Sequence, residues 1–321
     1  MPARVSVVVI SYNSEATLGA CLAALGRQTF TDFHLLVIDN ASARRPSTYL
    51  GALPYAHTFL DLDENLGFAG GMALAVDKAE SPLIAALNPD AFPEPTWLAE
   101  LAAAAEQHPE AAAFGSLQRS AADPARIDGF GDHMLATGQA WRGQQAPAGD
   151  NLVYCFGVCA AAALYRTDAV RAIGNFDRRF FCLYEDVDLS FRLRLAGHQC
   201  AVVPRAVVSH VGGASFKTRA PLLQRLIGRN QWWVLLKNMP FPLVLLAVPG
   251  FFAVEFLAAL RGHRPGSLGG LLEGLRRSGE MLDSRREIQK AARISPATLC
   301  RWLTWAPSAF LRKQSPVRRS L

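Results

Sequence analysis

The chain has 321 residues, of which half are hydrophobic and 19% are charged. This length suffices for one large α/β domain with an appendage, or for two domains, with a sizeable core. The six cysteines form no C-x-x-C pair, which predicts reduced thiols in a cytoplasmic protein and argues against a disulfide framework.

The formal net charge of +6 is unevenly distributed along the chain. Residues 261–321 carry 13 Lys and Arg against 4 Asp and Glu, a net +9, whereas residues 1–260 carry 20 against 23, a net −3. A basic C-terminal segment can meet nucleic acid or an anionic lipid surface, or can simply be solvated.

The first third of the chain alternates strands with helices. Its first apolar run is too short for a signal peptide and predicts a buried strand. The predicted strands are Val5–Ile10, His34–Ile38, His57–Leu60 and Leu83–Leu87. Helices between them predict βαβ units and a mainly parallel sheet. Asp39, Asn65 and Asp90 follow the carboxyl ends of strands, where open α/β sheets bind ligands.

The middle of the chain is less regular. A helix is predicted from Pro95 to about Gln107, and a strand over Ala111–Leu117. Residues 119–150 are rich in Gly, Ala, Asp and Pro, which favours an irregular insertion over the site. Two short strands, Gln199–Val203 and Ala206–Ser209, are predicted to lead to His210.

Three carboxylates mark the start of another helix. Val187, Phe191 and Leu195 share one helical face, which places Glu185, Asp186 and Asp188 at the N-terminus. The positive end of the helix dipole favours ionised carboxylates, so one with a pKa near about 3.9 would be a charged base at neutral pH. An alternative is that these acids only decorate the helix start.

Beyond Lys217 the periodicity becomes helical. Met239–Leu260 is almost uncharged and long enough to span a bilayer, but Pro249 and Gly250 favour two short halves over one straight span. This apolar stretch and the basic residues after it predict attachment to a membrane surface. The alternative is a helical pair packed on the rest of the chain or on a second subunit.

Six ordered motifs resemble the inverting family 2 glycosyltransferases with a GT-A fold, and among them the rhamnosyltransferase-like members. The motifs are Val5–Asn13, Asp39–Ser42, Asn65–Gly70, Asn88–Asp90, Glu185–Leu189 and His210 with its Gly-Gly-Ala-Ser sequel. The resemblance implies a catalytic domain over residues 1–220, with a nucleotide-binding part (1–95) and an acceptor part (96–220). A helical, basic extension over 221–321 follows.

The resemblance also assigns residues to the nucleotide sugar. Asp39 matches the family position that binds the base, and Asn65 and Gly67 match the diphosphate loop, where glycine permits close backbone approach. Glu185 is assigned to the donor as well. Taken alone, Asp39 and Asn65 could equally cap turns.

A metal and a base complete the implied site. Asn88-Pro89-Asp90 aligns with the family's D-x-D motif but replaces its first aspartate, so Asp90 and His210 are the expected ligands of Mn²⁺ or Mg²⁺. Asp186 matches the catalytic base. Alone, Asn88–Asp90 could be a turn, and a lone histidine is more often structural than a ligand.

The resulting hypothesis is an enzyme that moves rhamnose or a similar sugar from a dTDP- or UDP-linked donor to a glycan or lipid-linked acceptor for the cell envelope. It would be cytoplasmic and peripheral on the inner face of the membrane, with no nucleic acid partner and possible homo-oligomerisation. A dinucleotide-dependent oxidoreductase is disfavoured because the first strand ends in Ser-Tyr-Asn without G-x-G-x-x-G. A non-catalytic, nucleotide-binding, membrane-associated adaptor is the remaining alternative.

Overall fold

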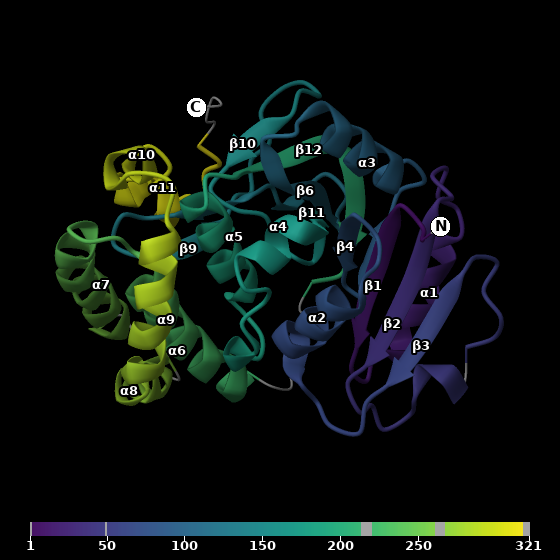
Figure 1. The fold of residues 1–321 in the computed structure, drawn as a ribbon, viewed down its shortest axis with the longest axis horizontal. Coiled ribbons are helices and arrows are strands. Elements are labelled where there is room, and N and C mark those ends of the chain that lie inside the picture. Colours follow the sequence, from purple (N-terminus) through teal and green to yellow (C-terminus); the bar gives the residue numbers. More distant parts are fainter. Residues whose placement is uncertain (1, 49, 213–219, 261–266, 317–321) are drawn as a thin grey trace.

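The computed structural model describes residues 2–48, 50–212, 220–260 and 267–316. In this part of the chain one ten-stranded sheet is flanked by helices, and the C-terminal helices gather at the end of the molecule away from β1, β2 and β3 (Figure 1). The main strand order is β10-β12-β6-β11-β4-β1-β2-β3, and β8 and β9 form a separate pair.

The N-terminal half of the sheet is parallel, as the sequence predicts, because β1 pairs in parallel with β2 and β4, and β2 with β3. Every residue of β1 is buried, since the sheet is covered on both faces. The elements in chain order are β1 (Val5–Ser11), α1 (Glu15–Leu25), β2 (Phe33–Asp39), the 3₁₀ turn η1 (Pro46–Thr48), β3 (His57–Asp61), α2 (Gly67–Lys78) and β4 (Leu83–Leu87).

Beyond β4 the sheet is mixed, because β11 runs antiparallel to both β4 and β6. The predicted insertion over 119–150 is more ordered than expected and contains three short strands. The elements are β5 (Ala91–Pro93), α3 (Trp97–Gln107), β6 (Ala111–Ser120), β7 (Ile127–Gly129), β8 (Asp132–Met134), β9 (Ala140–Arg142), β10 (Val153–Cys155), β11 (Ala162–Arg166), α4 (Thr167–Ala172), η2 (Arg178–Phe180), α5 (Glu185–Leu195) and β12 (Gln199–His210).

The prediction of two separate strands before His210 is wrong, since β12 is continuous. Its register against β6 shifts between Val203 and Val207. Pro204 lies in this interval and has no N–H to donate to the ladder. The proline therefore produces a bulge within one strand, where the sequence pattern suggested two strands.

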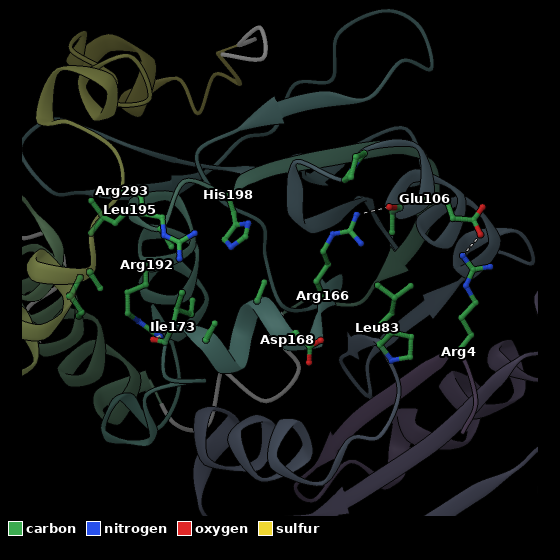
Figure 2. A pocket seen from close by; sticks show the side chains of 18 residues that line it. Arg4, Leu83, Glu106, Arg166, Asp168, Ile173, Arg192, Leu195, His198 and Arg293 are labelled. Carbon is green, nitrogen blue, oxygen red and sulfur yellow. Dashed lines mark hydrogen bonds and ion pairs between the residues drawn. The ribbon is translucent and has the colours of Figure 1, made fainter. Parts of the chain in front are cut away.

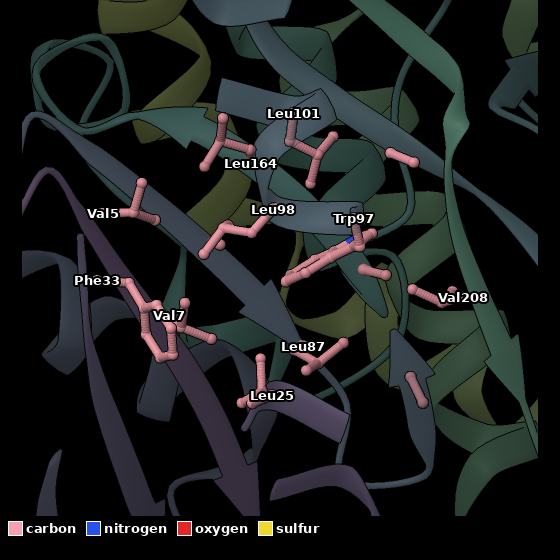
Figure 3. Close-up of a cluster of buried hydrophobic side chains, with 14 of the residues drawn as sticks. Val5, Val7, Leu25, Phe33, Leu87, Trp97, Leu98, Leu101, Leu164 and Val208 are labelled. Atoms are coloured by element: carbon pink, nitrogen blue, oxygen red, sulfur yellow. The ribbon is translucent and has the colours of Figure 1, made fainter. Parts of the chain in front are cut away.

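Two hydrophobic cores lie on the two faces of the sheet. One packs α1 and α3 against the strands, with Trp97 fully buried at its centre (Figure 3). The indole Nε1 of Trp97 donates to Ser116 Oγ on β6 at 2.8 Å, so its polar atom is satisfied as well. The other core packs α2, α4 and α5 on the opposite face.

The C-terminal segment is helical, as predicted. Its helices are α6 (Ala220–Asn238), α7 (Leu243–Leu260), α8 (Ser267–Arg276), α9 (Ser278–Ala291), α10 (Pro296–Cys300) and α11 (Pro307–Leu311). The expectation that Pro249 and Gly250 divide the apolar stretch into two halves is wrong, because α7 continues through Pro249. Gly250 faces Thr137 so closely that a Cβ would lie 2.4 Å from the Thr137 Cγ2. Within the described ranges, no helix meets the length and apolarity needed to cross a bilayer.

A buried charge network joins α5 to α6. Asp188 is fully buried and accepts from Arg192 Nη2 at 2.7 Å, from Lys237 Nζ at 2.9 Å and from Asn238 Nδ2 at 2.8 Å. Lys237 also donates to Asp177 at 2.7 Å. Since α6 supplies two of the three partners of Asp188, α6 belongs physically to the body that carries α5. The proposed boundary at residue 220 stays a prediction.

We predict that Lys237→Met lowers the free energy of unfolding by about 3 kcal/mol, because it removes the cation that bridges the buried Asp188 to Asp177 and leaves each carboxylate with a single arginine. Chemical denaturation of the full chain measures the effect. Lys290→Met, the same change at an exposed position of α9, is the control and should stay within about 0.5 kcal/mol. A loss below about 1 kcal/mol for Lys237→Met would show that the network does not fasten α5 to α6.

Candidate active site

The residues matched to the nucleotide base and diphosphate lie at the carboxyl end of β2 and in the loop after β3. Asp39 ends β2 and is 1% exposed. Its Oδ2 accepts from Ser42 N at 2.9 Å and its Oδ1 from Ser42 Oγ at 2.5 Å. Asp39 therefore caps the turn that follows β2, and contact with a nucleotide base stays a prediction.

The predicted diphosphate loop is joined to the segment before α5. Asn65 Oδ1 accepts from Gly67 N at 2.8 Å, and Asn40 Nδ2 donates to Gly67 O at 3.0 Å. Gly67 has φ +70°, and a Cβ there would lie 2.2 Å from Phe181 O. Ala69 N donates to that same carbonyl oxygen at 2.9 Å. Only glycine fits at position 67, because of its positive φ and this contact with Phe181, and contact of Gly67 with a diphosphate stays a prediction.

Asp90 and His210, the expected metal ligands, are neighbours. Asp90 follows β4, His210 ends β12, and Asp90 Oδ1 lies 3.5 Å from His210 Nε2. His210 Nδ1 contacts Asp128 Oδ2 at 2.8 Å. A carboxylate on Nδ1 with Nε2 turned to a second ligand is the arrangement that orients metal-binding histidines. The residues present therefore fit a divalent ion.

The carboxylates next to His210 stabilise positive charge at this place. Burial opposes a charge on His210, but the hydrogen bonds to Asp128 and Asp90 outweigh burial and raise the pKa of His210 to about 9. Asp90 and His210 supply only two ligands, fewer than a divalent ion needs. In the described ranges no group of three His, Cys, Asp or Glu side chains is arranged to hold an ion. An ion held here would need further ligands, such as substrate phosphate oxygens.

Asp186 lies beside the end of β4. It is the second residue of α5, and its Oδ2 accepts from Ala160 N at 3.2 Å. Asn88 N donates to the carbonyl oxygen of the next residue, Ala161, at 2.8 Å. The segment 160–161 therefore connects the Asn88–Asp90 turn to Asp186, and both lie at one edge of the sheet.

Two acids near Asp186, namely Asp132 and Glu185, have raised pKa values. Burial, and then the charge of Asp186, raise the pKa of Asp132 to about 7 and that of Glu185 well above its usual range. Glu185 is 6% exposed, and its Oε2 has no hydrogen-bond partner among the described residues. The raised pKa disfavours the ionised form of Glu185 that a general base requires. The donor contact predicted for Glu185 is not tested.

Three further residues of the site lie in the 119–150 segment, and the sequence interpretation did not single them out. Arg142 on β9 has its Nε 3.6 Å from Asp132 Oδ1, and its charge interacts with those of Asp128 and Asp186. The charge of Arg142 thus acts on both His210 and Asp186. A cluster of Asp and His residues within a glycine-rich stretch was the available signal. Of the Gly-Gly-Ala-Ser sequel to His210, residues 213–215 lie outside the described residues.

The comparison with family models identifies the family. The model for Glycosyl transferase family 2 matches residues 6–174, more than half of the chain. The chain therefore belongs to glycosyl transferase family 2. The match ends before Asp186 and His210, so the family model leaves the assignment of these two residues untested.

Curated relatives match more than half of the chain. Galactofuranosyltransferase GlfT1 of Mycobacterium tuberculosis is 30% identical over 207 residues, which are 61% of this chain and 66% of that protein. N-acetylglucosaminyl-diphospho-decaprenol L-rhamnosyltransferase of the same organism is 29% identical over 234 residues, which are 64% of this chain and 75% of that protein. The match thus spans slightly less than two thirds of the length of the first relative.

Solved structures support the fold. Mannosyltransferase PcManGT from Pyrobaculum calidifontis, determined with GDP-Man and Mn²⁺, superposes with a TM-score of 0.53 at 16% identity. The superposition covers 91% of this chain and 86% of that one. The GT-A fold that the sequence motifs predict is therefore confirmed.

We predict that Gly67→Ala destabilises the protein by about 3 kcal/mol, because alanine disfavours positive φ and its Cβ collides with the Phe181 carbonyl. Gly19→Ala in α1 is the control, since no atom lies within 4 Å of its added Cβ. This control should gain up to about 1 kcal/mol from helix propensity. Chemical denaturation compares the two variants, and equal stabilities would refute the close approach of Gly67 to Phe181.

Proposed function

We propose that this protein is an inverting glycosyltransferase that moves a sugar from a nucleoside diphosphate donor to an acceptor hydroxyl group. The observation that carries the proposal is the placement of Asp186 beside the Asp90 and His210 pair at one edge of the sheet, linked through residues 160–161. This edge is formed by the carboxyl ends of the parallel strands, where α/β folds bind nucleotides.

The chemistry divides between the two ends of the site. Asp186 accepts the proton of the acceptor hydroxyl while the hydroxyl oxygen forms a bond to the anomeric carbon. The bond from that carbon to the diphosphate oxygen breaks, and the nucleoside diphosphate leaves with the electron pair. Attack opposite the leaving group inverts the anomeric configuration. Mn²⁺ or Mg²⁺ held by Asp90 and His210 would neutralise charge on the departing diphosphate.

The neighbouring acids support Asp186 as the base in preference to Glu185. Asp186 is partly exposed, whereas Glu185 is buried and its pKa is raised. Arg142 places a positive charge near Asp186, Asp132 and Asp128, which limits the repulsion among these carboxylates. We propose that Arg142, which lies beside Asp132, favours the ionised form of the base through its charge.

Asp186→Asn should lower the turnover number by about 10²–10⁴-fold with little change in donor binding, since the amide keeps the shape but accepts no proton. The assay is sugar transfer from a panel of UDP-, dTDP- and GDP-linked donors. Asp283→Asn, at an exposed position of α9, is the matched control. Turnover of Asp186→Asn within tenfold of the parent would remove Asp186 as the base.

The metal assignment predicts non-additive effects on nucleotide binding. Asp90→Ala and His210→Ala should each weaken Mn²⁺-dependent binding of the donor nucleotide, and the double variant should lose less than the sum, because both side chains hold one ion. Calorimetric titration measures this, with Asp63→Ala, an almost fully exposed carboxylate, as control. Additive losses, or full transfer activity in excess EDTA, would contradict the assignment.

We further propose that the donor sugar is rhamnose or galactofuranose and that the acceptor is lipid-linked, in cell-envelope polysaccharide synthesis. The names of the two relatives support this proposal, since one is a galactofuranosyltransferase and the other acts on a diphospho-decaprenol acceptor. We propose a dTDP- or UDP-linked donor, as the family resemblance implies.

An exposed apolar surface supports attachment to the inner face of a membrane. Five large apolar side chains on or next to α7 are more than half exposed, namely Phe241, Leu245, Leu246, Phe256 and Leu260. Helix α7 lies at the outer edge of the helical group (Figure 1). Such a surface next to basic residues favours binding at the membrane–water interface. There the free energy of burying apolar side chains adds to the attraction between basic residues and anionic headgroups. Part of the basic segment, residues 261–266 and 317–321, lies outside the described residues.

In liposome flotation, the full chain should float with anionic vesicles, and salt should reduce this binding without abolishing it. Leu246→Glu combined with Phe256→Glu should leave most of the protein at the bottom of the gradient. Ala16→Glu combined with Ala20→Glu on exposed positions of α1 adds the same charge and should still float. Failure of the parent protein to float at low salt would exclude the membrane role and favour an oligomer interface.

A further inference from the structure

A cavity lies at the opposite edge of the sheet from the candidate active site. Its volume is about 780 Å³, within the range of small-molecule sites. It is lined by Leu83 at the amino end of β4 and by Arg166 at the end of β11, whereas Asp90 follows the carboxyl end of β4. The length of β4, roughly 17 Å, therefore separates the two places.

Three basic side chains from different elements line this cavity. Arg166 comes from β11, His198 from the turn before β12 and Arg293 from the segment after α9 (Figure 2). Burial, and then the charges of Arg293 and Arg166, lower the pKa of His198. His198 thus senses the positive charge of both arginines, and the three side chains act on one space.

These basic groups have unused hydrogen-bonding capacity. Arg166 is held by carbonyl oxygens, with Nε donating to Ala111 O at 2.8 Å and Nη2 donating to His108 O at 3.1 Å. Its Nη1, both ring nitrogens of His198 and the guanidinium of Arg293 have no hydrogen-bond partner within the described ranges. The fixed donors of Arg166 and the two other side chains could therefore converge on an anion.

The acidic side chains that line the cavity each form an ion pair with an arginine other than Arg166 and Arg293. Glu106 pairs with Arg4, and Asp168 lies 3.9 Å from Arg171 Nη1. Arg192, a further cation of the lining, is bound to Asp188. No acid among the described residues of the lining is paired with Arg166 or Arg293, so the charge that these two residues bring to the cavity is positive, and Glu110, outside the lining, acts on Arg166 alone of the two.

We propose that this cavity binds a phosphate monoester whose phosphate group lies among Arg166, His198 and Arg293. A phosphate monoester carries about −1.5 to −2 charge at neutral pH and three acceptor oxygens, which matches two guanidinium groups and an imidazole. The remaining lining includes Ile173, Leu195 and Ile288, which suit an apolar body on the ester. This proposal is independent of the reaction at the other edge of the sheet.

The test is calorimetric titration of the full chain with phenyl phosphate in the presence of EDTA. We expect saturable binding of one molecule per chain, and a loss of about tenfold or more in affinity for Arg293→Glu, because a carboxylate would face the phosphate. His198→Gln should weaken binding less. Arg286→Glu, the same charge reversal at an exposed position of α9, should bind like the parent.

Two outcomes would overturn the proposal. One is the absence of saturable heat up to about 10 mM phenyl phosphate. The other is unchanged binding in Arg293→Glu, which would place the anion elsewhere on the protein. Arg293 is exposed, so its variant should fold, and a thermal melt of each variant verifies this. Asp90→Ala should bind phenyl phosphate like the parent, which separates this site from the candidate active site.

Discussion

The burial of Asp188 is the constraint on which the position of the candidate base depends. This carboxylate is inaccessible to water and is compensated by Arg192 on its own helix and by Lys237 and Asn238 on α6. A buried carboxylate with these partners is costly to move, because any displacement leaves a charge unpaired. Asp186, two residues earlier on α5, is therefore held in place by residues of the C-terminal segment.

The same helix α6 also stabilises an unusual backbone before α5. Phe181, Leu183 and Tyr184 all have positive φ without being glycine, which costs conformational energy. Asn230 Nδ2 compensates by donating to the carbonyl oxygens of Cys182 and Leu183 at 3.0 and 2.6 Å. Since Phe181 O also meets the Gly67 loop, this strained segment connects the predicted diphosphate loop to the base.

Much of the fold could be predicted from sequence because its signals are local. The β-branched strands and their alternation with helices predicted β1 to β4, and the apolar spacing of Val187, Phe191 and Leu195 predicted α5. Misjudged features depended on tertiary context. Helix α7 continues through Pro249, and Arg142 meets Asp132 only through the pairing of β8 with β9. No local pattern marks either feature.

The site itself was predicted in part. The structure brings Asp90 and His210 together from strands far apart in sequence and places Asp186 nearby, as the motifs indicated. Asp39 and Asn65 make turn-capping hydrogen bonds within their own loops, and their contacts with a nucleotide stay predictions. Position 67 requires glycine because a Cβ there would collide with the Phe181 carbonyl. The sequence shows the glycine but not this contact.

The central claim is that Asp186 and the Asp90 and His210 pair face one substrate from two ends. Anomalous diffraction from crystals of the full chain grown with Mn²⁺ and the nucleoside diphosphate that binds tests this claim most directly. The account predicts a manganese peak bonded to Asp90, His210 and the diphosphate, with Asp186 on the other side of the sugar subsite. A manganese peak remote from both residues, or a diphosphate bound away from this edge of the sheet, would contradict it.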